Sequence, residues 1–262
     1  MVISPLARTV IHDLKRRLVL ILTLTYPIPL MIEEPPKLTI KRPSRRPSAE
    51  QIEAFKDVPT GFVVDAMDGS GALAPHIKPL EGGRDLNTVV VGPALTVDNG
   101  PADILALLGA LSFIQPGDMV VSSFGGYQGC ASCGDRLAGM IKNNNANALI
   151  SDGPIRDYAG VVGVRLPVWC TGINPNSPVS QGPGRIGLPI SIGGCEVETG
   201  DIIVADRDGV VVVPFEHIQM VIERLDKIKE LELALDREVE EGLKQPPAIA
   251  ELLSSDAVRF VD

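Results

Sequence analysis

The sequence predicts an α/β fold, and three observations lead to it. Between residues 119 and 170, short apolar runs alternate with helical patterns in the order strand, helix, strand, helix, strand, which is typical of a parallel sheet. The chain has 26 Gly and 22 Pro, which indicates many tight turns between short elements. Hydrophobic residues make up 45% of the chain but aromatic residues only 4%, so the core must be mainly aliphatic.

The first part of this pattern mixes short helices with one strand. Ser48, with Gln51 three residues later, forms a capping-box pattern that predicts a helix start. Residues 60–67 predict a second short helix. Residues 87–97 are rich in β-branched side chains and predict a strand that bends at Gly92-Pro93. Residues 102–113 predict an apolar helix with Asp103 in its first turn.

The central alternation supplies the expected parallel sheet. Residues 119–122, 148–151 and 167–170 predict short buried strands, and residues 132–143 and 157–162 predict the helices between them. After residue 172 the pattern changes. Residues 173–213 predict strands and turns only, which we interpret as antiparallel hairpins packed on the α/β part.

The C-terminal region predicts one long helix over residues 215–242, because apolar side chains recur on a single stripe. We interpret such a stripe as core or as an oligomer contact. We expect residues 48–245 to form one domain, residues 246–262 a tail with a weak helix, and residues 1–47 an N-terminal extension.

The extension has its own composition. Lys15, Arg16 and Arg17 precede the apolar run Leu18 to Tyr26, which resembles a signal peptide. No small-residue cleavage site follows, and the run is shorter than the ~20 residues that span a bilayer. We therefore favour an extension that packs on a neighbouring surface or stays loose, and we expect no membrane partner. Residues 41–48, KRPSRRPS, predict a linker.

The net charge and the cysteine content exclude some classes of protein. The formal net charge of −9 disfavours a nucleic-acid partner, because phosphate binding needs clustered Lys and Arg. Four cysteines in 262 residues are too few for a secreted disulfide scaffold. We expect a reduced, cytoplasmic protein.

The stretch from residue 122 to 157 carries the candidate site. A strand ends at Ser122, Gly125 and Gly126 follow, and a helix begins near Ser132. The N–H groups at such a helix start can bind an anion, and Gly134 would allow its close approach. No Lys and Ser/Thr follow the glycines as they do in a nucleotide-binding P-loop. The alternative, a plain strand-to-helix turn, stays open.

A second turn, residues 152–157, ends in Arg156 beside Asp157. Arg156 is expected at the carboxyl edge of the sheet, where ligands of α/β folds commonly bind. Its planar guanidinium suits a carboxylate, and Asp157 could accept a metal-bound water. The alternative is a local ion pair with Asp157 as a helix N-cap.

Cys130 and Cys133 form a CxxC pattern at the expected helix start, where thiol pKa values are often lowered. A redox pair or a zinc site with Cys170 and Cys195 is one interpretation. Two small residues that fill a helix–loop contact are the favoured one. His12, His76 and His217 are scattered, which argues against histidine-based catalysis.

Four motifs, in this order and spacing, resemble the RraA-like family of 4-hydroxy-4-methyl-2-oxoglutarate aldolases, or class II pyruvate aldolases. They are Gly125-Gly126 with Gly134-Asp135-Arg136-Leu137-Ala138, then Ser151 to Asp157, Pro167-Val168-Trp169, and Asp201 to Pro214. The resemblance runs from about Ile52 to Leu235. Many family members carry the label demethylmenaquinone methyltransferase. Arg136 departs from the family pattern, which often has Leu there, and Cys130 and Cys133 are outside that pattern.

The resemblance implies a swivelling β/β/α-type single domain with central strands flanked by helices, assembled as a homotrimer or homohexamer. It places a 2-oxo acid on Gly134, Asp135, Arg136, Leu137 and Arg156. It implies that Asp157 holds Mg²⁺ or Mn²⁺ largely through water, with Arg156, Asp135 and Asp157 as the catalytic residues.

The implied reaction is metal-dependent cleavage of a 4-hydroxy-2-oxo acid to pyruvate through a metal-stabilised enolate. Oxaloacetate decarboxylation is the implied side activity, since it gives the same enolate. The alternative is a non-catalytic, protein-binding regulator of RNA degradation, as some relatives in this family are. A methyltransferase is disfavoured, because no glycine-rich strand–loop–helix is followed by an acidic ribose ligand.

Overall fold

The structure is a computed structural model, and it describes residues 35–261. The apolar run Leu18 to Tyr26, for which the sequence left a targeting role open, lies outside these residues. Among the residues described, no helix has the length and apolar character needed to cross a membrane. The domain boundaries expected at residues 47 and 245 stay a prediction.

A central sheet runs in the order β1–β7–β3–β4–β5–β6–β2. Strands β3, β4, β5 and β6 are parallel neighbours, as the alternating pattern predicts. The bounds are β1 Leu38–Ile40, β2 Lys78–Pro79, β3 Val90–Asp98, β4 Met119–Ser123, β5 Ala148–Ser151, β6 Val168–Cys170 and β7 Gly184–Ile186.

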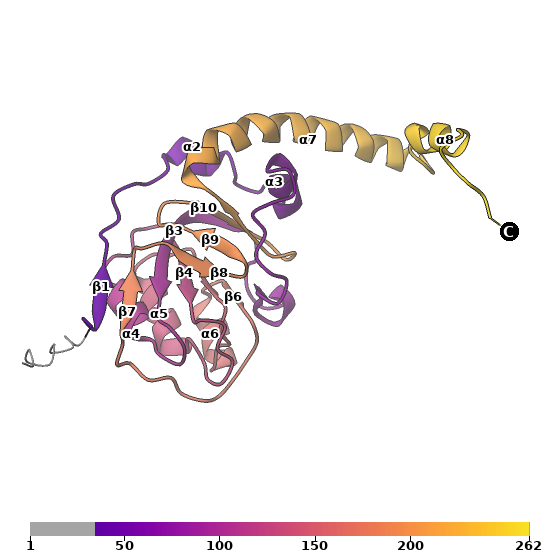
Figure 1. Ribbon diagram of the computed structural model, residues 1–262. Coiled ribbons are helices and arrows are strands. Elements are labelled where there is room, and N and C mark those ends of the chain that lie inside the picture. Colours follow the sequence, from indigo (N-terminus) through magenta and orange to yellow (C-terminus); the bar gives the residue numbers. More distant parts are fainter. Residues whose placement is uncertain (1–34, 262) are drawn as a thin grey trace, which may run out of the picture. The chain divides into compact units, whose positions relative to one another are not determined.

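Three helices cover one face of this sheet: α4 (Leu105–Ala110), α5 (Asp135–Asn143) and α6 (Tyr158–Val164) (Figure 1). Alternate strand residues point to this face, so Leu95, Val120 and Leu149 pack with Leu107 and Leu137 in one buried cluster. The α/β prediction is confirmed, with a fully buried parallel centre.

The other face packs on antiparallel hairpins, as predicted, although β7, which also lies within residues 173–213, joins the central sheet instead. Strands β8 (Ile190–Ile192) and β9 (Cys195–Val197) form one hairpin, and β10 (Ile202–Ala205) and β11 (Val210–Val213) form another. Met119, Ile150 and Trp169 pack there with Ile190 and Ile203. The indole Nε1 of Trp169 donates to the carbonyl oxygen of Asp206 at 2.9 Å.

Strand β3 changes partner where the sequence predicts a bend. Residues 90–93 pair with β10, whereas residues 94–98 pair with β4. A side chain at Gly92 would put its Cβ 2.1 Å from the carbonyl oxygen of Gly117. The glycine is therefore needed for close approach between two backbones, and β3 remains one strand across the bend.

A third layer lies on the outer face of β10 and β11. It contains α2 (Ala49–Glu53), α3 (Thr60–Ala66) and the first part of α7 (Ile218–Glu240), which follows a 3₁₀ turn, η2 (Phe215–His217). The capping box of Ser48 and Gln51 is confirmed. A second 3₁₀ turn, η1 (Leu80–Gly83), and a tail helix, α8 (Pro247–Leu253), complete the elements.

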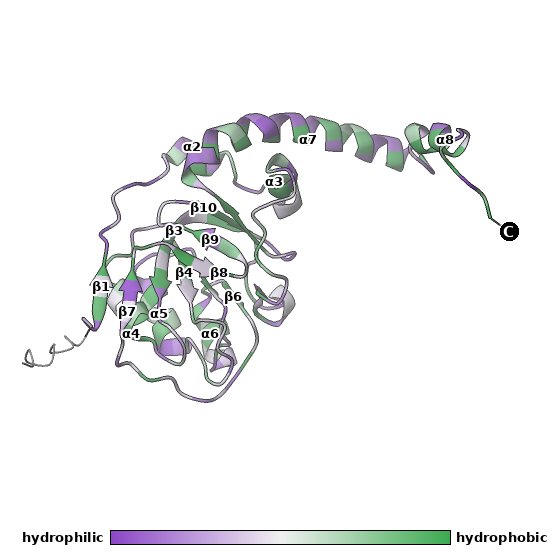
Figure 2. Ribbon diagram, viewed as in Figure 1, coloured by the Kyte–Doolittle hydropathy of each residue, from purple (hydrophilic) through white to green (hydrophobic). Residues whose placement is uncertain are grey.

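The long helix α7 divides into a buried and an exposed half. Val221 and Leu225 are fully buried, but the stripe continues into Leu231, Leu235 and Val239, which are 60%, 45% and 57% exposed. Figure 2 shows hydrophobic and hydrophilic residues interleaved along its whole length. The sequence predicts that this apolar stripe is either core or an oligomer contact. In the structure, only its first half is part of the core.

The helix predicted over residues 102–113 is shorter than expected, because the carboxylate of Asp103 accepts hydrogen bonds from backbone amides instead of lying in the first helical turn. Its Oδ1 accepts from the amide of Leu105 at 2.7 Å, and its Oδ2 accepts from the amides of Gln181 and Gly182. Asp103 thus precedes α4 and ties the 181–182 loop to it. The prediction that Asp103 lies in the helix's first turn is wrong.

The basic segment predicted as a linker is held against the body. Strand β1 pairs in parallel with β7. Arg45 then forms ion pairs with Glu198, Asp201 and Glu216, and Arg46 forms one with Asp118. Two of these partners, Asp118 and Asp201, are buried, so the segment neutralises carboxylates inside the fold.

Candidate functional site

Three segments that are distant in sequence run side by side at the carboxyl edge of the sheet. The amide of Ser132 donates to the carbonyl oxygen of Pro154 at 2.7 Å, and the amide of Arg156 donates to that of Cys133 at 2.9 Å. On the other side, Ile155 donates to the carbonyl oxygen of Gly172 at 2.9 Å. This short ladder places Arg156 beside the residues that begin α5.

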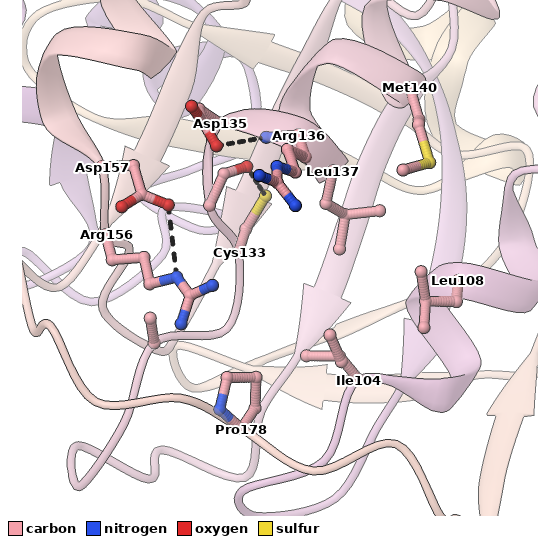
Figure 3. A pocket seen from close by; sticks show the side chains of 12 residues that line it. Ile104, Leu108, Cys133, Asp135, Arg136, Leu137, Met140, Arg156, Asp157 and Pro178 are labelled. Atoms are coloured by element: carbon pink, nitrogen blue, oxygen red, sulfur yellow. Dashed lines mark hydrogen bonds and ion pairs between the residues drawn. The ribbon is translucent and has the colours of Figure 1, made fainter.

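A cavity of about 470 Å³ opens next to this ladder (Figure 3). All six residues that the sequence assigns to the site lie in its wall: Gly134, Asp135, Arg136, Leu137, Arg156 and Asp157. The remaining lining residues are Ile104, Leu108, Ala131, Cys133, Met140 and Pro178. The structure therefore brings the predicted residues together, while their roles stay predictions.

Arg156 is held at two of its three guanidinium nitrogens. Nε lies 3.2 Å from Oδ2 of Asp157, and Nη1 donates to the hydroxyl of Ser177 at 2.6 Å. Within residues 35–261, Nη2 makes no hydrogen bond and stays available to a ligand. Ser177 was not predicted from the sequence. The only signal near it is the turn-forming run Asn174-Pro175-Asn176, which indicates a loop.

The start of α5 presents free backbone donors. Gly134 is the N-cap, and the carboxylate of Asp135 accepts from the amide of Arg136 at 2.6 Å. The amides of Asp135 and Leu137 donate to no group of the described chain. These N–H groups and the helix dipole favour an anion in the cavity.

Gly134 is required here for space. A Cβ at this position would lie 2.6 Å from Oδ2 of Asp157 and 3.2 Å from Nε of Arg156. Its backbone is extended, with φ of −128°, so strain is not the reason. The missing side chain lets the ion pair approach the helix start.

Asp157 does not act as the side-chain cap that the alternative interpretation expects. It precedes α6, but its side chain makes no capping hydrogen bond, and its backbone is left-handed with φ of 59°. This conformation costs an ordinary L-residue about 1–2 kcal/mol, and aspartate is one of the few residues other than glycine that adopt it more readily. The carboxylate, 44% exposed, pairs with Arg156 instead. Of that alternative, the ion pair and the N-cap position are therefore present, but the capping hydrogen bond is not.

Gly125 and Gly126 do not line the cavity, but Ala131, Cys133 and Gly134 at the end of the same loop line it together with Arg156 and Asp157 of the turn. Asp152 holds the loop by accepting from the amides of Phe124 and Gly126. Burial raises the pKa of Asp152, although both hydrogen bonds oppose the shift. The helix predicted from residue 132 begins at Asp135, because residues 131–134 belong to the ladder.

The expectation of a lowered thiol pKa in the CxxC pattern is wrong. Cys130 and Cys133 are 5% and 4% exposed. Burial raises the pKa of Cys130, and it raises that of Cys133 to about 12. Cys133 packs in the buried cluster under α5 and also lines the cavity. Raised thiol pKa values keep both cysteines as thiols at neutral pH rather than nucleophilic thiolates.

The carboxylates of Asp135 and Asp157 are the candidate metal ligands. Both line the same side of the cavity (Figure 3). Among the described residues, no three His, Cys, Asp or Glu side chains converge to hold a metal ion. Two carboxylates with water completing the shell suit Mg²⁺, which dehydrates reluctantly and often keeps several waters.

A comparison with models of protein families identifies the family to which this chain is related. Residues 60–212 match the RraA-like family, described as Aldolase/RraA. The chain belongs to this family. A relative from Halalkalibacterium halodurans with the provisional name 4-hydroxy-4-methyl-2-oxoglutarate aldolase is 35% identical over 192 residues, which cover 73% of this chain and 90% of the relative.

Two solved structures extend the comparison to other RraA-like proteins. One is from Streptomyces coelicolor and is described as an unusual member of the RNase ES inhibitor RraA protein family. It is 29% identical with a TM-score of 0.63, covering 74% of this chain and 100% of that one. Another, from Geobacillus kaustophilus, is described as an S-adenosylmethionine: 2-dimethylmenaquinone methyltransferase. It is 29% identical with a TM-score of 0.53, covering 60% and 94%.

Proposed function

We propose that this RraA-like protein is a divalent-metal-dependent lyase that cleaves a 4-hydroxy-2-oxo acid to pyruvate. The reference substrate is 4-hydroxy-4-methyl-2-oxoglutarate, after which the relative from Halalkalibacterium halodurans is named. Oxaloacetate decarboxylation is proposed as a second activity of the same site. One observation supports this most directly: the guanidinium of Arg156, two carboxylates and two free amides share a single cavity.

The first role is to bind the 2-oxo acid. Nη2 of Arg156 and the amides of Asp135 and Leu137 are donors that a carboxylate can accept from. Asp157 and Ser177 fix the guanidinium plane, so Arg156 is oriented before the ligand arrives. A charge already in place stabilises the developing enolate without reorganisation.

The bond between carbons 3 and 4 breaks when the 4-hydroxyl loses its proton. That proton passes to a water held by Asp135 or Asp157, and the bond electrons move onto the pyruvate part as an enolate. Protonation at carbon 3 then gives pyruvate, and carbon 4 leaves as a ketone or an aldehyde. Mg²⁺ or Mn²⁺, held by Asp157 through water, would supply Lewis-acid polarisation of the keto oxygen.

The test is pyruvate release from the reference substrate and from oxaloacetate, first with Mg²⁺ or Mn²⁺ and then with excess chelator. Release that needs the metal and is lost in Arg156→Ala supports the proposal. Release at the rate of the uncatalysed reaction with both metals and both substrates would overturn it.

A second candidate is a binding protein that regulates an RNA-degrading enzyme. The Streptomyces coelicolor relative and the exposed apolar stripe of α7 at Leu231, Leu235 and Val239 favour it. It is tested by adding the protein to an RNase E-type endonuclease and measuring RNA cleavage. Inhibition without any pyruvate release would replace the lyase proposal with this one.

A further inference from the structure

Two arginines line the cavity, and only one of them has side-chain partners in the described chain. Arg156 is held by Asp157 and Ser177. Within residues 35–261, no hydrogen bond or ion pair involves the guanidinium of Arg136, an exposed residue of the cavity wall. Figure 3 shows this guanidinium between the Arg156–Asp157 pair on one side and Leu137 on the other. The cavity therefore presents a second, unpaired cation.

The position of Arg136 in α5 is electrostatically unfavourable. It is the second residue of the helix, where the positive end of the helix dipole repels a cation. Lys142, in the last turn of the same helix, has the favourable placement. The amide of Arg136 already donates to the carboxylate of Asp135 at 2.6 Å, so this backbone group is not free to hold a ligand. An exposed, unpaired cation at this end of a helix lowers stability without adding core packing, which is typical of a functional position.

We propose that the guanidinium of Arg136 binds the second carboxylate of the substrate, the one bonded to carbon 4. This inference rests on the proposed function and names the side chain that makes the site specific for a dicarboxylate. The carboxylate of the pyruvate part lies against Nη2 of Arg156 and the amides of Asp135 and Leu137. The second carboxylate lies against Arg136, whose free guanidinium can donate two parallel hydrogen bonds to it.

The experiment compares 4-hydroxy-4-methyl-2-oxoglutarate with an analogue in which the second carboxylate is replaced by a neutral carboxamide of nearly the same shape. The quantity measured is the ratio of kcat/KM for the acid to kcat/KM for the amide, because the intrinsic reactivities of the two compounds then cancel between variants. In Arg136→Gln this ratio should fall about tenfold from its wild-type value, the order expected for losing one hydrogen bond to a charged group. Arg136→Lys should lose less, since an ammonium group keeps the charge but not the planar fork.

Lys142→Gln is the control, since it removes a cation from the same helix but outside the cavity wall. Its acid-to-amide ratio should equal that of the wild-type protein. Thermal unfolding should separate the two variants, because Arg136→Gln removes an unfavourable charge from α5 and should raise Tm, whereas Lys142→Gln should lower it. A lower Tm in Arg136→Gln, or a change in its oligomer mass on size-exclusion chromatography, would assign the guanidinium to a structural or subunit contact and overturn the inference.

Exchange of the methyl protons of pyruvate with deuterated water tests the lyase separately, because it needs the enolate and pyruvate has no second carboxylate. If the wild-type protein catalyses this exchange with Mg²⁺ or Mn²⁺ but Arg136→Gln keeps the wild-type acid-to-amide ratio, the inference fails and the lyase stands. Absence of exchange in the wild-type protein with both metals would reject the lyase itself.

Discussion

Nε of Arg156 lies 3.2 Å from Oδ2 of its sequence neighbour Asp157, and this pair faces the start of α5 across Gly134. Here the left-handed backbone of Asp157 turns its carboxylate back toward the guanidinium. The geometry therefore depends on one unfavourable backbone conformation and one missing side chain.

Arg156→Ala should lower kcat/KM for the reference substrate by about 10²–10³, the effect of losing one preorganised oxyanion donor. Arg156→Lys should recover only part of this loss, because an ammonium group cannot contact Asp157, Ser177 and a carboxylate in one plane. Steady-state pyruvate release measures both. Arg224→Ala, which removes an exposed ion pair on α7, is the control, and an equal loss there would mean a general effect on folding.

Asp157→Gly should raise the free energy of unfolding by about 1 kcal/mol while it abolishes activity, because glycine adopts positive φ freely. The exposed ion pair that is lost contributes little. Thermal unfolding should show a Tm increase of roughly 2–4 °C.

Arg165→Gly is the matched control. Arg165 also has a left-handed backbone, with φ of 61°, at the other end of α6, but it is not part of the cavity wall. This variant should be stabilised and keep full activity. If Asp157→Gly loses stability, the strain assigned to Asp157 is wrong.

Gly134→Ala should leave the protein folded but reduce kcat/KM strongly, since the new methyl group would push Asp157 and Arg156 off the helix start. Gly163→Ala in α6, where a Cβ meets no atom within 4 Å, should be tolerated and gain helix propensity. Activity and thermal unfolding of the two variants distinguish a local from a general defect. Normal activity in Gly134→Ala would contradict the contact geometry.

Stability should fall as pH rises from about 9 to about 11, because burial raises the pKa of Cys170 to about 11 from its usual value of 9.0. In this window the unfolded chain releases a proton that the folded chain keeps, so deprotonation favours unfolding. The contribution is fully present below the unfolded pKa. Denaturant unfolding at several pH values should show a shallower decrease for Cys170→Ala, and identical slopes would refute the assignment.

The parallel centre could be predicted from sequence because its strands are continuous apolar runs with turn residues at both ends. The pairing of β1 with β7 could not, since two three-residue strands more than 140 residues apart carry no periodic signal. The six predicted site residues meet in one cavity because two neighbouring strands end at the same edge of the sheet.

Other parts of the site could not be predicted from the sequence, for physical reasons. Ile104, Leu108 and Met140 have the spacing of ordinary core residues, and only the structure shows that they face a cavity. The lowered thiol pKa expected for the CxxC pattern is wrong because desolvation of the buried Cys133 outweighs any effect of the nearby helix start. Ser177 lies on an irregular loop, where no pattern specifies which side chain reaches Arg156.

The contacts of Arg45 and Arg46 matter for anyone who wishes to shorten this protein. A chain that begins at Ser48 would keep the whole family match. It would lose Arg45 and Arg46, so the buried carboxylates of Asp118 and Asp201 would have no cationic partner. It would also leave β7 as a bare sheet edge, open to pairing with another molecule. A chain that begins at Lys37 retains both arginines and the covering strand, and is the better starting point for crystallisation or engineering.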